Sequence, residues 1–272
     1  MKAQGKRVPA LLFGLLALGL LLASPAAAAE EFDKYALESV GVELSTSQAG
    51  GHADLTTSLE LTQEKTEPFA FTRDIFVSLP PGVIGNPQNF PRCSIAELGE
   101  TLEESNCPQD SQVGVVETTL ADYGTLIEPI YNMEPPGGDI VARLGFFAAI
   151  YPVVVNVRVD PQDYSLVAAV ESAPAAAKLV SAITTLWGVP AADVHDELRL
   201  TPQEALIREL PPGGRPSGQP EIPFLSNPTD CSLKREISVT AVSYQLPSKP
   251  STLSAPFPQI SGCEKLTCIS AP

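Results

Sequence analysis

The chain has 272 residues, of which 44% are hydrophobic, and its 32 acidic residues outnumber its 17 lysines and arginines to give a net charge of −15. This length can fold as one large or two small domains and can bury a sizeable core. The acidic balance disfavours nucleic acid as a partner because it repels phosphate backbones, and it suits a protein that stays soluble outside the cell.

The first 29 residues have the pattern of a Sec-type signal peptide. Lys2, Lys6 and Arg7 precede an apolar run over residues 11–23, and small residues lead to a cleavage site near Ala29. The apolar run is too short for a bilayer, which takes about 20 apolar residues. We therefore expect a secreted or cell-surface protein with no membrane span in the mature chain. That chain carries 14 basic and 32 acidic residues, a net charge of −18.

Apolar and polar residues alternate over most of the mature chain, which is typical of half-buried β-strands. The 27 prolines lie mostly between these runs, where they do not interrupt a ladder of hydrogen bonds. We expect residues 30–272 to form a single, mainly β domain, an antiparallel two-sheet β-sandwich with long loops and one or two short helices. The expected strands cover residues 37–44, 52–62, 71–79, 112–120, 126–132, 140–147, 152–159, 164–170, 183–187 and 237–246.

Short helices are expected at two places. The sequence SIAE at 94–97 fits a capping box, so a helical turn should begin there. The sequence TPQE at 201–204 supplies an N-cap hydroxyl, a proline at the first helical position and an acidic third position, which predict a helix that ends by residue 210. Residues 173–186 are ambiguous, and we favour a strand that ends at 187–188 and is preceded by at most a helical turn.

Five cysteines, which an exported protein is expected to oxidise in pairs, are present: Cys93, Cys107, Cys231, Cys263 and Cys268. Their proximity favours Cys93–Cys107, which would clip the loop between two strands. Cys231–Cys263 would then tie the ends of the last strand region, and Cys268 would be left over. A local Cys263–Cys268 bridge is the alternative. Because no C-x-x-C spacing occurs, zinc and thioredoxin-type redox sites lack support.

Few residues can carry chemistry. The sequence contains no G-x-S-x-G, H-E-x-x-H, G-x-x-x-x-G-K or G-x-G-x-x-G motif and no EF-hand loop, so we expect no cofactor. Catalysis by histidine would have to use His52 or His195. His52 and Asp54 share a face at the start of a strand, where they could ligate a metal or form a base with its orienting group. Turn chemistry alone also accounts for both residues.

Residues 193–199 contain the densest polar cluster, with Asp193, His195, Asp196 and Arg199. One interpretation is an acid–base or metal site in which Arg199 binds an anion. The other is a solvated helical turn that Asp193 caps and in which Asp196 pairs with Arg199.

Several phrases together resemble one family: LPPGVIGNPQNFPRCS, CPQDSQVG, PIYNMEPP, LWGVPAADVHDELR, PFLSNPTDC and GCEKL. In this order they are similar to a group of secreted, β-rich actinobacterial proteins of the Solirubrobacter-like kind, over about residues 40–268. The resemblance implies no particular activity, cofactor or catalytic residue. It does imply that further β-domains and an envelope attachment often follow such a module, so this chain would be a truncated form. Similar sequences tend to have an apolar residue at position 268, which supports Cys268 as the odd cysteine.

We expect a structural or adhesive role, or ligand binding, in a secreted or cell-envelope protein whose partner is an envelope or extracellular glycan or protein. The alternative is an extracellular carbohydrate-active or other hydrolase that uses carboxylates around 193–197, which requires an open cleft with two carboxylates about 5–10 Å apart. Sugar binding would place Trp187 on an exposed aromatic platform, although a lone tryptophan is also a common core residue. Asp160 and Asp163 are a weaker candidate site, for calcium.

Overall fold

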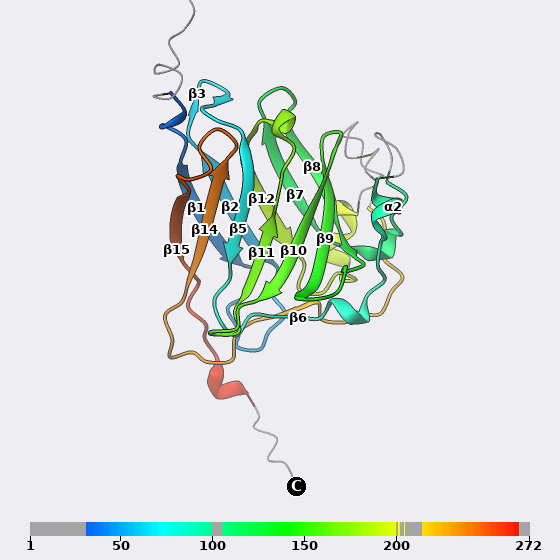
Figure 1. Ribbon diagram of the computed structural model, residues 1–272. Helices are drawn as coiled ribbons and strands as arrows, with labels where there is room; N and C mark the ends of the chain where they lie inside the picture. The colour runs from blue at the N-terminus through cyan, green and yellow to red at the C-terminus, as the bar shows by residue number, and fades with distance from the viewer. Residues whose placement is uncertain (1–30, 100–104, 200, 202–203, 205–213, 267–272) are drawn as a thin grey trace, which may run out of the picture.

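The computed structural model describes residues 31–99, 105–199, 201, 204 and 214–266. Within them, eleven strands form one antiparallel sheet (Figure 1). Across the sheet the strands follow the order β1 (Leu37–Leu44), β2 (Leu55–Leu61), β12 (Leu179–Leu186), β7 (Gln112–Leu120), β8 (Gly124–Met133), β9 (Ile140–Ala148), β10 (Tyr151–Val159), β11 (Leu166–Val170), β5 (Thr72–Ser78), β14 (Glu236–Ser243) and β15 (Ser251–Pro256).

Smaller elements connect these strands in the described residues. Two short ribbons pair β3 (Gln63–Glu64) with β4 (Glu67–Pro68) and β6 (Ile84–Gly85) with β13 (Leu225–Ser226). The helical elements are α2 (Ile95–Leu98) and the 3₁₀ turns η1 (Pro87–Asn89), η2 (Gln109–Ser111), η3 (Ala175–Ala177), η4 (Asp193–Leu198) and η5 (Cys263–Lys265).

The main sheet curls into a nearly closed barrel, so the predicted two-sheet sandwich is wrong (Figure 1). The two ends of the sheet meet where the Leu37 N–H on β1 donates to Ser251 Oγ on β15 at 2.9 Å. A sandwich and a barrel both bury one face of every strand, so alternation cannot separate them. Long-range pairing decides between them here, since β12 lies between β2 and β7, and β5 lies between β11 and β14.

The inward face of the barrel holds the main hydrophobic core. Ile237, Val239 and Ala241 alternate along β14 and are at most 1% exposed. Ile75 and Val77, two residues apart on β5, lie in this core or pack against it. The mainly β prediction is therefore confirmed, and its period-2 pattern marks the interior of the barrel.

The expected strands all form, with their ends shifted by a few residues, and η3 supplies the helical turn before β12. Of the eleven strands in the main sheet, β15 is the one that the sequence did not reveal. It pairs only with β14 at the edge of the sheet, and its central residues, 252–254, are all exposed. An edge strand with so little burial leaves no hydrophobic alternation to read.

Three expectations fall wholly or mainly outside the described residues: the signal peptide, Cys268 and most of the helix predicted to end by residue 210. The start of that helix can be judged from Thr201 and Glu204. The Thr201 N–H donates to Glu204 Oε2 at 2.8 Å, and the Glu204 N–H donates to Thr201 Oγ1 at 3.2 Å. This reciprocal pair is the expected N-terminal cap.

The disulfide Cys93–Cys107 closes a loop within the segment that leads into β7. The Cys93 N–H and C=O both hydrogen bond to backbone groups at the end of β8. The expected capping box forms, as Ser94 and Glu97 exchange hydrogen bonds at the start of α2. Leu98 is fully buried and belongs to a separate small core that includes side chains of β8 and β9.

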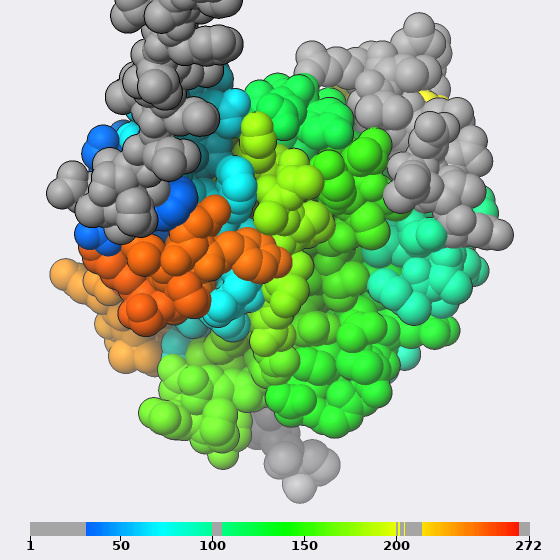
Figure 2. Space-filling view, turned by 45° about the horizontal axis from the view of Figure 1, so that its top comes forward, coloured from blue at the N-terminus to red at the C-terminus, as the bar shows by residue number. Residues whose placement is uncertain are grey.

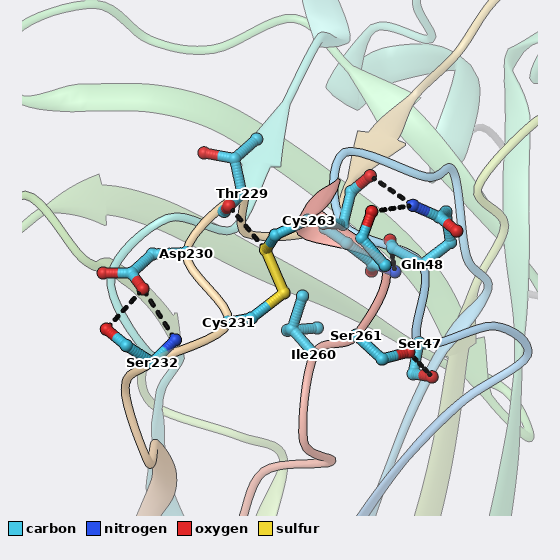
Figure 3. The surroundings of a disulfide bond; sticks show 12 residues. Ser47, Gln48, Thr229, Asp230, Cys231, Ser232, Ile260, Ser261 and Cys263 are labelled. Atoms are coloured by element: carbon cyan, nitrogen blue, oxygen red, sulfur yellow. Dashed lines mark hydrogen bonds between the residues drawn. A yellow bond between two sulfur atoms is a disulfide. The ribbon is translucent and has the colours of Figure 1, made fainter. Parts of the chain in front are cut away.

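The disulfide Cys231–Cys263 ties the C-terminal segment to the connection between β13 and β14, and the segment also lies beside the loop between β1 and β2 (Figure 3). In this loop Gln48 pairs with Ser261 in a parallel bridge, and its Nε2 donates to Gly262 O at 3.0 Å. Gly262 has a φ of 75°, and a Cβ there would lie 2.6 Å from Gln48 Oε1, so this tight approach requires glycine. Both disulfides join the cysteines that the sequence spacing favoured.

Replacing Cys231 and Cys263 with serine should lower the free energy of unfolding by about 4 kcal/mol, because this crosslink joins residues 32 apart and restricts the unfolded chain. Denaturant titration of the oxidised proteins measures the loss. Reduction is the control, since it should destabilise the wild-type chain more than the double variant. Equal unfolding midpoints for the variant and the oxidised wild type would contradict the role given to this bridge.

Candidate functional site

His52 and Asp54, which the sequence suggested as a pair, have different partners. His52 is exposed, and its Nδ1 lies 3.1 Å from both Leu225 O and Ser226 Oγ. Asp54 contacts His195 instead, with 3.1 Å between Asp54 Oδ2 and His195 Nε2. The structure therefore joins one residue from each of the two polar clusters, and His52 is not part of the contact.

The Asp54 carboxylate is held on both of its oxygens. The Gly188 N–H donates to Oδ1 at 2.8 Å, and His195 binds Oδ2. Burial alone would raise the pKa of Asp54, but the hydrogen bonds from His195 and Gly188 and the charge of His195 outweigh it and lower the pKa. Position 188 needs glycine because a Cβ there would lie 2.1 Å from His52 O.

His195 and Arg199 both pack on Trp187. The His195 ring stacks on Trp187 with 4.5 Å between centroids and 9° between planes, and the Arg199 guanidinium lies 5.4 Å from the Trp187 ring. Arg199 also donates to Pro190 O at 2.6 Å and to Ala192 O at 3.0 Å. Trp187 is 0% exposed and the other two side chains are 4% exposed. This is a packed cluster, so Trp187 forms no exposed platform for a sugar.

The acidic residues of η4 diverge from one another. Asp193 and Glu197 are exposed, whereas Asp196 Oδ1 accepts a hydrogen bond from Arg199 Nε at 3.1 Å. The Asp196–Arg199 pair is the one expected of a helical turn, here a 3₁₀ turn. The geometry supports that structural interpretation and brings Asp193 and Glu197 to the surface, away from the buried His195.

An apolar cavity of about 160 Å³ lies inside the barrel. Nine strands contribute inward-facing side chains to its wall: β2, β5, β7, β8, β9, β10, β11, β12 and β14. Leu59, Val116, Leu144, Val155 and Leu186 illustrate the chemistry of this wall, which is dominated by aliphatic groups. Because each strand presents alternate residues inward, the cavity is a property of the closed sheet and of no single sequence motif.

The connection from β11 to β12 lines one end of this cavity with residues 173–175, Ala177 and Lys178. Figure 1 shows this connection at the top of the barrel, and Figure 2 shows that end covered by yellow-green and green segments. Lys178 Nζ lies 3.1 Å from Asp122 Oδ1 and 3.4 Å from Glu67 Oε2. These salt bridges attach the connection to two neighbouring loops.

Glu128 on β8 is a buried acid that sequence analysis missed. It is 1% exposed, and its Oε2 has no hydrogen-bond partner among the described residues. Its cross-strand partner is Val116, and Ile130 follows two residues along the same face; both line the cavity. Burial raises the pKa of Glu128 to about 8. A glutamate flanked by Leu126 and Ile130 at inward positions of an alternating run was the signal available in the sequence.

Other candidate sites have local structural explanations. Asp160 Oδ1 accepts the Gln162 N–H at 2.8 Å, and Asp163 Oδ1 accepts the Ser165 N–H at 2.9 Å, so both carboxylates stabilise a turn. In the part of the chain that the structure describes, no three His, Cys, Asp or Glu side chains converge to hold a metal ion. No helix within the described ranges is long and apolar enough to cross a membrane.

Comparisons with known proteins give no relative for this chain. No protein-family model matches it, and searches of curated proteins and of solved structures find no similar chain. A functional proposal therefore rests on the geometry of the barrel and its side chains.

Replacing Asp54 with asparagine should lower the free energy of unfolding at pH 7 by about 1–3 kcal/mol, since the carboxylate bound by Gly188 and His195 is lost. The folded-state pKa of Asp54 lies below its ordinary value of 3.8. Its stabilising effect is therefore present above pH 4 and is lost as the pH falls through the folded-state value. The wild type and variant should converge in denaturant titrations as the pH falls below the folded-state pKa of Asp54. Asp193→Asn is the exposed control, and a difference independent of pH would contradict the pairing.

Replacing Glu128 with glutamine should stabilise the protein increasingly as the pH rises from about 4.5 to about 8, its ordinary and folded-state pKa values. In this window the unfolded state ionises while the folded state holds its proton, so the wild type loses about 1.4 kcal/mol per pH unit relative to the variant. Denaturant titrations at four pH values measure the difference. Glu117→Gln on the opposite face of the sheet is the control, and parallel pH profiles for Glu128→Gln and wild type would refute the prediction.

Proposed function

We propose that this chain is an exported protein of the extracellular space or cell envelope that binds a small apolar ligand inside its barrel. The cavity of about 160 Å³ carries the proposal. An engineered apolar cavity of about 150 Å³ in another protein stays dry and binds benzene, so a site of this size and lining suits a ring or a short alkyl chain. The signal-peptide pattern and the two disulfides support export.

The cost of the cavity argues that it is used. Protein interiors pack as densely as organic crystals and contain few voids larger than a water molecule. At about 24 cal/mol per Å³, a void of this volume costs about 4 kcal/mol, a large part of the 5–15 kcal/mol that stabilises a typical domain. A bound apolar ligand restores the missing contacts and offsets this cost.

Two other roles come from the sequence. The structural or adhesive role is the alternative proposal, and it predicts that the cavity takes no ligand. The hydrolase proposal needs two carboxylates of residues 193–197 in an open cleft, whereas Asp196 is paired with Arg199, and the exposed Asp193 and Glu197 line neither the barrel cavity nor the groove around Arg199. The resemblance to secreted actinobacterial proteins is compatible with both ligand binding and a structural or adhesive role, and it is offered as part of this proposal.

Toluene should raise the melting temperature of the wild-type protein, because a ligand that binds only the folded state stabilises it. At 100 times its Kd the gain is about 2.7 kcal/mol. Replacing Ala182, which lines the cavity, with phenylalanine should weaken toluene binding by at least tenfold in calorimetry while the fold is kept.

Ile183→Phe is the matched control, because Ile183 is the next residue of β12 and is 40% exposed on the outside of the sheet. Toluene should bind this variant as it binds the wild type. An absence of any stabilisation of the wild-type chain by toluene, benzene or hexane would overturn the proposed function and favour the structural or adhesive role.

A further inference from the structure

Among the polar side chains that face the interior, Thr118 and Glu128 each have an atom without a partner in the described residues. Thr118 is 2% exposed, lines the cavity, and its Oγ1 has no hydrogen-bond partner among the described residues. Glu128 is 1% exposed, and its Oε2 is likewise unpartnered in the described part of the chain. Thr118 lines the cavity, whereas Glu128 lies next to lining residues, opposite Val116 and two residues from Ile130. A buried hydroxyl or carboxyl without a partner is costly, so these two groups need an explanation.

The strand register places these two groups on one face of the sheet. Val116 on β7 lies opposite Glu128 on β8, and Thr118 lies opposite Leu126. Thr118 and Glu128 are therefore diagonal neighbours, a relation in which Cβ atoms are about 7–8 Å apart and long side chains are within reach. A small polar group between them could hydrogen bond to both.

The charge state of the pair selects the kind of group that fits. Within the described residues, no lysine, arginine or histidine forms a salt bridge with Glu128. With its pKa raised to about 8 by burial, Glu128 is mainly a neutral acid at pH 7. A neutral carboxyl and a hydroxyl each donate and accept one hydrogen bond or more. An uncharged oxygen group satisfies both without bringing a charge into an apolar interior.

We infer that the ligand is an amphiphile with one uncharged oxygen group, a hydroxyl or a carbonyl, which hydrogen bonds to Glu128 and Thr118 while its apolar body fills the cavity. This inference rests on the proposed function, since it specifies the ligand of the same cavity. A carboxylate ligand would meet no cation paired with Glu128 in the described residues, and Lys178, which lines one end of the cavity, is already paired with Asp122 and Glu67. An ammonium ligand would need Glu128 ionised.

Matched ligands test the inference in the whole protein. Calorimetry at pH 7 gives the Kd of toluene and of benzyl alcohol, which differ by one hydroxyl, for the wild type and its variants. The measured quantity is the ratio of the two Kd values, because it cancels the contribution of the shared ring. We expect Glu128→Leu to weaken the binding of benzyl alcohol at least tenfold relative to that of toluene. Glu128→Gln can still donate and accept a hydrogen bond, so its ratio of Kd values should stay close to that of the wild type.

A second variant guards against a folding effect at position 128. Thr118→Val keeps the shape of the side chain and removes only its hydrogen-bonding atom, and it should shift the ratio in the same direction. Glu117→Leu is the control, because Glu117 lies next to Thr118 on the opposite face of β7 and pairs with exposed Ile127. It should leave both Kd values unchanged.

The outcomes separate the two proposals. If toluene binds and neither variant changes the ratio, the inference about the polar group is overturned and the apolar site stands. Tighter binding of benzylamine or benzoate than of benzyl alcohol would also overturn it. If neither toluene nor benzyl alcohol binds the wild-type protein, the proposed function falls, and this inference falls with it.

Discussion

The backbone hydrogen bonds of a single curled sheet are the constraint on which the rest of this structure depends. Every inner strand must pair on both sides, and the chain meets this requirement with neighbours that are distant in sequence. Strand β12 is inserted between β2 and β7, and β5 between β11 and β14. Once the ends of the sheet meet at the Leu37–Ser251 contact, the alternate side chains of all these strands face one interior.

That interior contains a cavity, and this is where stability and the proposed ligand binding conflict. A void and an unpartnered Glu128 both destabilise the folded state. Features elsewhere in the fold stabilise the folded state and offset this loss. Two disulfides restrict the unfolded chain, and Trp187, His195 and Arg199 pack on one another in the segment that follows β12. Natural proteins commonly accept a local cost at a functional site and stabilise the fold elsewhere.

Individual residues show how far the sequence could be interpreted. Ser94 and Glu97 form the expected cap because capping depends on residues three apart. The pairing of Asp54 with His195 joins residues 141 apart, and only the contact between β2 and the segment after β12 creates it. Sequence analysis named both residues but assigned them to separate sites. Glu128 was overlooked because an acidic residue within a strand is ordinarily on the solvent side.

By itself, the sequence determined the mainly antiparallel β class, the positions of ten of the eleven barrel strands, the local caps and the favoured cysteine pairs, because alternation, capping and proximity are short-range properties. The tertiary structure decided that the sheet closes into a barrel and does not split into a sandwich, that Trp187 is core, and that an apolar cavity lies inside the barrel. Each of these depends on which strands become neighbours, and an alternating pattern carries no information about its partner.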